Sequence, residues 1–226
     1  MKRLILVLIV LAALFVAADR AAVAFAEREA AQRIQQYEDL GGRPQVDIRG
    51  FPFLTQALAM RFDHIDVTFD EVGAGTLRAA EARIALFGVS PMNGGGAASI
   101  ERLRGAVLVG YDELEATLGR EGLSLGPGPD GRLRIEGSAD VLGRSVDVAA
   151  DSRVDIDGGD TLVVRAERVE AEGAGVSAPV EALVRDRLDF QVSIPTLPDG
   201  FQVRDVRVTP RGVEVIVRGR TLAFPP

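Results

Sequence analysis

Residues 203–217 read Val-Arg-Asp-Val-Arg-Val-Thr-Pro-Arg-Gly-Val-Glu-Val-Ile-Val, near the end of a chain of 226 residues. Valines recur among polar residues on both sides of Pro210-Arg211-Gly212. A period of about two residues marks a strand with one buried face, and proline followed closely by glycine marks a tight turn. The stretch therefore predicts an antiparallel hairpin.

The same short period recurs through most of the chain. Its other apolar positions are Val46 and Ile48, Ile65, Val67 and Phe69, Leu133 and Ile135, Val146 and Val148, and Val154 and Ile156. Turn-forming residues at 129–131, 157–160 and 198–200 separate these segments. The short spacings leave little room for crossover helices, so we expect antiparallel meanders rather than a doubly wound parallel sheet.

Two short helices are expected between the strands. Residues 112–118 begin with Asp112 and Glu115 in a capping arrangement and stop at Gly119. Residues 179–188 begin with proline and carry apolar side chains on one face. No change of composition marks a domain boundary. Residues 27–226 are therefore predicted to form one α+β domain dominated by a long, curled antiparallel β-sheet.

Composition limits the partners and the chemistry that we expect. Hydrophobic residues make up 47% of the chain but aromatic residues only 5%, so the core must be mainly aliphatic. The formal net charge of −7 argues against a nucleic-acid partner, which would need a basic face. Cysteine is absent, which excludes disulfides, thiol catalysis and cysteine-ligated zinc.

The N-terminus predicts export. Lys2 and Arg3 precede an apolar run over residues 4–18, and apolar character resumes over residues 21–26 after Asp19-Arg20. The first run alone spans only about 22 Å, which suits a signal peptide, whereas both together are long enough to cross a membrane. Small residues at 16–18 and 24–26 provide possible cleavage sites.

We favour an uncleaved signal anchor over residues 1–26, with a cleaved signal peptide as the alternative. The predicted membrane-facing positions are Leu4, Leu8, Leu11 and Phe15. In both cases the basic start stays in the cytoplasm. The rest of the chain is then on the extracytoplasmic side of the plasma membrane, or periplasmic or secreted if the signal is cleaved.

Motifs for catalysis and metal binding are missing from the sequence. His64 is the only histidine, and its position predicts that it shares a polar strand face with Asp66 and Thr68. There is no Gly-x-Ser-x-Gly elbow for a serine nucleophile, no His-x-x-x-His pair for a metal, and no Gly-Lys-Ser/Thr after Gly94-Gly95-Gly96. The protein is therefore predicted not to be an enzyme, and no metal or cofactor is expected.

An apolar cluster at Phe51, Pro52, Phe53 and Leu54 follows the strand that ends at Gly50. Leaving such side chains in water costs about 2 kcal/mol each. They must therefore be core at a strand-to-helix corner, the lip of an apolar cavity, or a tip that touches a membrane. We predict these four residues as lipid contacts.

This segment also carries a resemblance to a known family. The order Ile-x-Gly-Phe-Pro-Phe-Leu-Thr-Gln at 48–56 resembles the signature of the LmeA-like phospholipid-binding family of actinobacterial cell-envelope proteins. Further matching segments follow in order: Tyr111-Asp112-Glu113-Leu114, Val141-Leu142-Gly143 and Pro195-Thr196-Leu197-Pro198. The resemblance covers essentially the whole chain.

The resemblance implies a protein outside the plasma membrane that binds phospholipids, phosphoinositides included, and acts in lipoglycan assembly. It also implies a tubular lipid-carrier architecture, in which a long sheet wraps around a helix and leaves an aliphatic groove. The predicted function is to hold or shuttle lipid. The alternatives are a non-catalytic partner of an envelope glycosyltransferase and, less favoured, a hydrolase or transferase of envelope lipids.

Overall fold

A computed structural model describes the parts of the chain from which the fold is built. The described residues are 2–36, 43–74, 77–91, 98–119, 122–141, 144–158, 161–171, 189–193 and 200–224. Internal contacts divide the chain into two compact units. Unit 1 comprises residues 1–70, 83–105 and 219–226, and unit 2 comprises residues 71–82 and 106–218.

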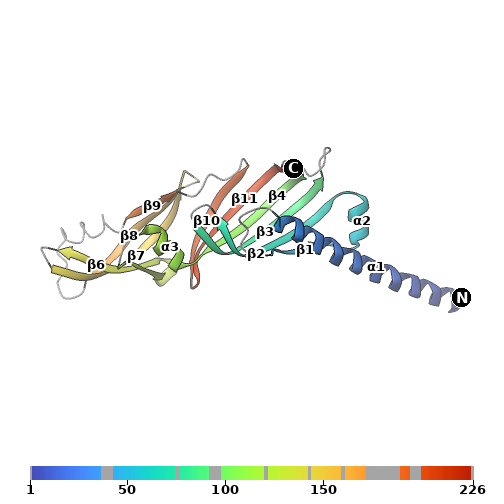
Figure 1. Ribbon diagram of the computed structural model, residues 1–226, viewed down its shortest axis with the longest axis horizontal. Coiled ribbons are helices and arrows are strands. Elements are labelled where there is room, and N and C mark those ends of the chain that lie inside the picture. The colour runs from blue at the N-terminus through green and yellow to red at the C-terminus, as the bar shows by residue number, and fades with distance from the viewer. Residues whose placement is uncertain are drawn as a thin grey trace. The chain divides into compact units, whose positions relative to one another are not determined.

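A single long helix, α1 (Lys2–Gln35), opens the chain (Figure 1). It runs without a break through the apolar residues and into the polar residues that follow, because no proline or glycine interrupts it. A short helix, α2 (Phe53–Leu58), follows the first strand and lies against α1. Both helices belong to unit 1.

The first sheet has the strand order β1-β2-β3-β4-β11-β10. Its strands are β1 (Gln45–Arg49), β2 (Phe62–Ala74), β3 (Leu77–Pro91), β4 (Ala98–Val109), β10 (Phe201–Thr209) and β11 (Gly212–Phe224). β1 and β2 pair antiparallel with Val46 opposite Val67 and Ile48 opposite Ile65. The hairpin predicted from residues 203–217 is confirmed as β10 and β11, joined at Pro210-Arg211.

The second sheet is an antiparallel meander within unit 2, in the order β5-β6-β7-β8-β9. Its strands are β5 (Ser124–Pro127), β6 (Leu133–Val141), β7 (Arg144–Asp157), β8 (Thr161–Ala171) and β9 (Phe190–Ser193). The turn predicted at 129–131 is a 3-10 turn, η1 (Pro129–Gly131). One helix, α3 (Tyr111–Leu118), packs against β5.

Unit 2 has an aliphatic core on one face of the second sheet. The buried members are Leu125, Leu133, Ile135, Val148, Ala150, Val164, Ala166 and Val213. Partly buried side chains of α3, among them Leu114 and Leu118, pack against this cluster. Alternate residues of β6, β7 and β8 point into it, as the period of two predicted.

The α+β class, the antiparallel pairing and the N-terminal apolar helix are confirmed, but the expected single long, curled sheet is not found. The described strands form two sheets, and neither is strongly curled. The reason lies in the connections. Short connections pair each strand from β5 to β8 with its neighbour in the sequence, and β9 pairs with β8, so these strands complete a sheet of their own instead of extending the first.

The predicted helix at 112–118 is confirmed as α3, and Gly119 ends it in the left-handed conformation with φ 58°. The predicted capping arrangement is wrong. The helix begins one residue earlier, its N-cap is Gly110, and Glu115 instead accepts a hydrogen bond from the Leu125 amide at 2.5 Å. The helix predicted at 179–188 lies outside the described residues.

Candidate functional site

Residues 50–56 build the corner that joins β1 through α2 to β2. Gly50 turns the chain with φ +103°, a conformation that residues with a Cβ rarely adopt. The Gln56 side chain then bridges both sides of the corner. Its Nε2 donates to the Arg49 carbonyl at 3.2 Å, and its Oε1 accepts from the Asp63 amide at 3.0 Å. The polar residues of the segment therefore hold the corner in place.

The structure separates the four predicted lipid contacts. Phe53 is buried and stacks on Phe62, with ring centroids 6.1 Å apart. Pro52 and Leu54 are half-buried. Phe51, by contrast, is 60% exposed, and the Arg20 guanidinium lies 5.4 Å from its ring centroid. Phe53 is thus a core residue of unit 1, while Phe51 presents an aromatic face to the surroundings.

Asp19 joins α1 to this corner. Its side chain is fully buried, and its Oδ1 accepts a hydrogen bond from the Leu54 amide at 2.9 Å. Its other oxygen pairs with Arg20 at 2.5 Å. No side chain of α2 itself caps that helix, so a carboxylate from α1 satisfies an amide of its first turn. Further along α1, Glu27 accepts from the Ile48 amide of β1 at 2.9 Å.

The predicted membrane-facing residues lie on the part of α1 that precedes Asp19. Leu4, Leu8, Leu11 and Phe15 are all exposed. By length and composition α1 is able to cross a membrane, with a mean hydropathy of 2.5 over its most apolar window of 18 residues. Figure 1 shows this N-terminal half of α1 leading away from the strands of unit 1.

Unit 2 contains an apolar cavity of about 40 Å³ between α3 and the second sheet. It is lined by Leu114, Thr117, Leu118, Leu125, Leu133, Val154, Leu162, Val164, Phe190 and Val213. These residues come from α3, from all five strands of the second sheet and from β11. Almost all of them are aliphatic, so the cavity suits hydrocarbon and offers little with which to bind a charged group.

α3 covers this cavity and is held by side chains along its length, among them Glu113, whose Oε1 accepts from the Arg78 amide at 2.9 Å. Tyr111 donates its hydroxyl to the Thr209 carbonyl at 2.5 Å, and burial raises the pKa of this phenol. Glu115 accepts from the Leu125 amide, as described above. None of the residues of α3 is fully buried. These hydrogen bonds and the partly buried apolar side chains of α3 therefore hold it against the second sheet.

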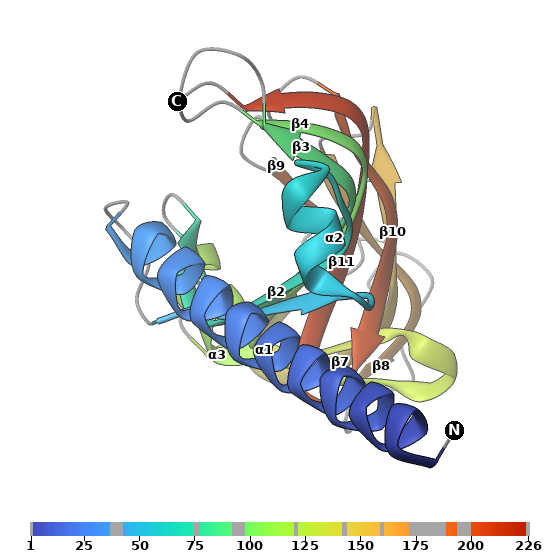
Figure 2. The same ribbon diagram turned by 90° about the vertical axis from the view of Figure 1, so that its right-hand side faces the viewer.

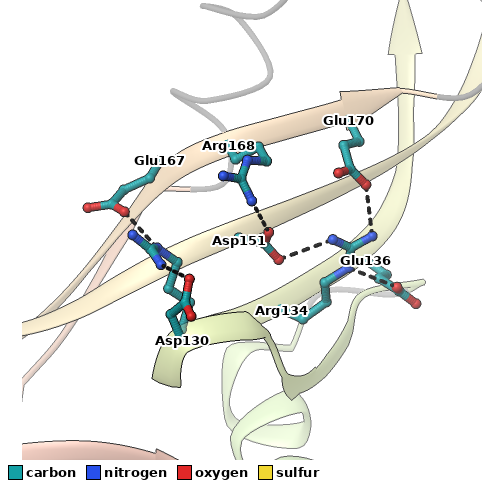
Figure 3. A network of polar contacts seen from close by, with 8 residues as sticks. Asp130, Arg134, Glu136, Asp151, Glu167, Arg168 and Glu170 are labelled. Atoms are coloured by element: carbon teal, nitrogen blue, oxygen red, sulfur yellow. Dashed lines mark hydrogen bonds and ion pairs between the residues drawn. The ribbon is translucent and has the colours of Figure 1, made fainter.

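The opposite face of the second sheet is polar (Figure 3). Arg134 binds the buried Asp151 at 3.1 Å, Glu170 at 3.0 Å and Glu136 at 3.2 Å, and these hydrogen bonds raise the pKa of its guanidinium. A hollow of about 650 Å³ on this face is lined in part by Arg134, Glu136 and Glu170. Because three carboxylates already surround Arg134, this hollow is poorly suited to bind a phosphate.

His64 lies on the polar face of β2, as predicted: its Nε2 is 2.8 Å from Asp66 Oδ1. Its ring stacks on Phe87 with centroids 4.5 Å apart. Arg102 and Arg104 lie over the same Phe87 ring, at 5.2 Å and 5.5 Å. Among the described residues, neither of these arginines has a carboxylate partner.

Sequence reasoning missed the cavity and the Asp19 contact. Leu133, Val154 and Val213 were expected to point inward, but the alternation does not say that α3 leaves space above them. For Asp19 the sequence did offer a signal, because a charged residue within an apolar run must find a partner when the helix is buried. The described residues bring together no group of three or more side chains suited to hold a metal ion.

Comparison with known families gives a match over most of the chain. The model of the LmeA-like phospholipid-binding family matches residues 17–218. The chain belongs to this family. The resemblance first seen at residues 48–56 is thereby confirmed, and membership supports phospholipid as the ligand. No curated protein and no solved structure is significantly similar to the chain.

The family match begins two residues before Asp19, so it takes in the junction between α1 and α2 as well as both sheets. The most apolar part of α1 precedes the matched range. The description of the family names phospholipid binding.

Proposed function

We propose that this family member is anchored by α1 on the extracytoplasmic side of the plasma membrane, where it holds or shuttles phospholipid during assembly of the cell envelope and its lipoglycans. Lys2 and Arg3 favour a cytoplasmic N-terminus. The exposed apolar residues before Asp19 support an uncleaved anchor, because they have no partner within the described chain. The role is one of binding rather than catalysis.

The observation that carries the lipid-binding proposal is the aliphatic cavity beneath α3. Pockets that hold small molecules usually measure about 300–1,000 Å³, which is far larger than the 40 Å³ found here. An acyl chain therefore enters only if the cavity widens. Outward movement of α3 is the simplest way, because the side chains that pack it against the core, Tyr111, Leu114 and Leu118, are only partly buried.

Narrowing the cavity tests this site. Val154→Phe places a larger side chain into it, whereas Val169→Phe makes the same change at a partly buried position of the same core that does not line the cavity. Full-length protein purified from membranes would be extracted, and its phospholipid quantified by mass spectrometry. We expect Val154→Phe to lose most bound lipid and Val169→Phe to keep it. Equal lipid in both variants would overturn this location.

A headgroup site is suggested by the cluster of His64, Phe87, Arg102 and Arg104 in unit 1. Guanidinium groups without a carboxylate partner are suited to bind phosphate, and anionic headgroups, those of phosphoinositides included, are the expected ligands. Replacing both arginines with glutamine should weaken binding to vesicles that contain anionic lipid and leave binding to neutral vesicles unchanged. Equal loss for both vesicle types would count against this cluster.

A second candidate function is favoured by the exposure of Phe51. The protein would then act as an assembly partner that docks an envelope glycosyltransferase. Crosslinking discriminates between the assembly partner and the lipid-binding protein. Position 51 is the suitable site because Phe53 is buried. A photoreactive residue at position 51 that yields protein adducts supports the assembly partner, and lipid adducts alone count against it.

A further inference from the structure

α1 changes its surroundings at one residue. Residues 2–18 are exposed, and the next residue, Asp19, is fully buried. At 1.5 Å per residue the exposed part of α1 measures about 25 Å. The hydrocarbon core of a bilayer is roughly 30 Å thick. If this part of α1 spans the membrane, Asp19 and the next turn of helix must lie at or just below the outer boundary of the hydrocarbon.

α2 lies at the same level as Asp19. The Leu54 amide donates to Asp19, and Arg20 lies over Phe51, so the start of α2 is tied to this turn of α1. Figure 2 and Figure 1 together show α2 beside the middle of α1 and directed across it rather than along it. A helix that runs across a membrane-spanning helix lies near the plane of the membrane.

The exposed side chains around α2 are large and apolar, as expected for a segment at the outer boundary of the hydrocarbon. Phe51 is 60% exposed, Leu58 is 86% exposed and Met60 is 60% exposed. Large apolar side chains cost free energy in water, and a group of them marks an interaction surface. Arg61 follows Met60 directly and pairs with Glu101 at 2.7 Å, so the apolar surface ends at a charged pair.

We propose that Phe51, Leu58 and Met60 form a surface that inserts into the outer leaflet, at a depth fixed by the bond between Asp19 and α2. The bilayer is the occupant because Phe51 and the start of α2 lie against the turn of α1 at which its exposed apolar part ends. Burial between the two helices also explains how a carboxylate is tolerated there, since a charge away from water must be paired and hydrogen-bonded. This inference rests on the proposed anchor.

The chain contains no tryptophan, so a single introduced tryptophan reports its own surroundings. Leu58→Trp is placed at the exposed position, Leu11→Trp serves as a reference within the proposed span, and Gln202→Trp serves as an exposed reference in β10. Each full-length variant is reconstituted into phosphatidylcholine vesicles. Quenching is then compared between lipids that carry a nitroxide near the headgroup and lipids that carry it near the end of the acyl chain.

We expect Leu58→Trp emission to shift to the blue and to be quenched most by the nitroxide near the headgroup. Leu11→Trp should be quenched most by the deep nitroxide, and Gln202→Trp by neither. If Leu58→Trp behaves like Gln202→Trp while Leu11→Trp is quenched, the insertion surface is wrong and the anchor stands. If Leu11→Trp is not quenched, the anchor itself fails, and the insertion surface fails with it.

The role of Asp19 is tested in the Leu58→Trp background. Asp19→Ala removes the acceptor of the Leu54 amide and should abolish the shallow quenching pattern. Asp19→Asn keeps an acceptor oxygen and should retain the pattern. Circular dichroism checks that the sheets of each variant are intact. An unchanged pattern in a folded Asp19→Ala variant would show that Asp19 does not set the depth.

Discussion

At the scale of single residues, the corner at 50–56 shows how a recognisable sequence signature is first of all a local structural device. Gly50 supplies a backbone conformation, Gln56 supplies hydrogen bonds to both sides, and Phe53 supplies core packing. After these roles are assigned, Phe51 remains as the large side chain of the segment that is mostly exposed. We therefore expect a ligand or membrane contact at this corner to involve Phe51 rather than all four predicted residues.

Gly50→Ala should destabilise unit 1. A Cβ at this position would lie 2.5 Å from Gln56 Nε2, and φ +103° is unfavourable for alanine. Backbone strain of this kind costs about 1–3 kcal/mol. Urea unfolding followed by circular dichroism measures the loss. Gly126→Ala is the matched control, because nothing lies within 4 Å of its Cβ. Similar midpoints for the two variants would contradict the assigned role of Gly50.

Ile135→Ala should be among the most damaging substitutions in unit 2. Ile135 is 0% exposed and lies within the aliphatic cluster. Truncating a buried isoleucine to alanine typically lowers the free energy of unfolding by about 2–5 kcal/mol. Ile156→Ala makes the same change at a half-buried position of β7 and should cost less. Thermal unfolding gives the comparison, and equal losses would mean that burial does not distinguish the two sites.

At the scale of elements, ion pairs link three parts of the polar face of the second sheet. Glu167 of β8 accepts from Arg132, which precedes β6, at 2.7 Å and from Arg153 of β7 at 2.6 Å. Hydrogen bonds from Arg132 and from Arg153 hold the pKa of Glu167 below its ordinary value of 4.5. The ionised carboxylate is thus favoured in the folded protein.

The sign of the pH dependence follows from this lowered pKa. The unfolded chain takes up a proton on Glu167 at a higher pH than the folded chain does. The stabilisation from Glu167 is therefore fully present above pH 4.5 and is lost as the pH falls through the folded pKa. Glu167→Gln should lower stability at neutral pH and reduce the loss on acidification. The measurement is urea unfolding between neutral and acidic pH, and parallel curves for the two proteins would contradict it.

At the scale of the whole molecule, α1 contributes to the folded protein as well as to the proposed membrane anchor. From Asp19 onward it packs on unit 1, with Val23 and Ala31 buried. The two possible cleavage sites therefore have different consequences. A chain that begins at Asp19 keeps the acceptor of the Leu54 amide, whereas a chain that begins at Glu27 loses it together with Val23.

We expect a chain that begins at Glu27 to be less stable than one that begins at Asp19. An amide left without its acceptor costs about 1–3 kcal/mol, and the loss of Val23 burial adds to this. Both chains can be produced without export and compared by urea unfolding. A chain beginning at Asp19 that carries Asp19→Ala should fall between the two. Identical midpoints for the Asp19 and Glu27 chains would show that this part of α1 adds no stability.

The sequence by itself predicted several of the strands, the α+β class and the N-terminal apolar helix, whereas β3, β4, β5, β8 and β9 were not predicted individually. Ile65, Val67, Leu133 and Ile135 reveal their strands because a period of two is a local property. Tertiary structure decided the division into two sheets, the cavity beneath α3 and the partner of Asp19, which binds an amide 35 residues away. The physical reason is that periodicity identifies which face of an element is apolar but not which element covers it. That choice depends on packing between segments far apart in the chain, and it determines where space and exposed apolar surface remain.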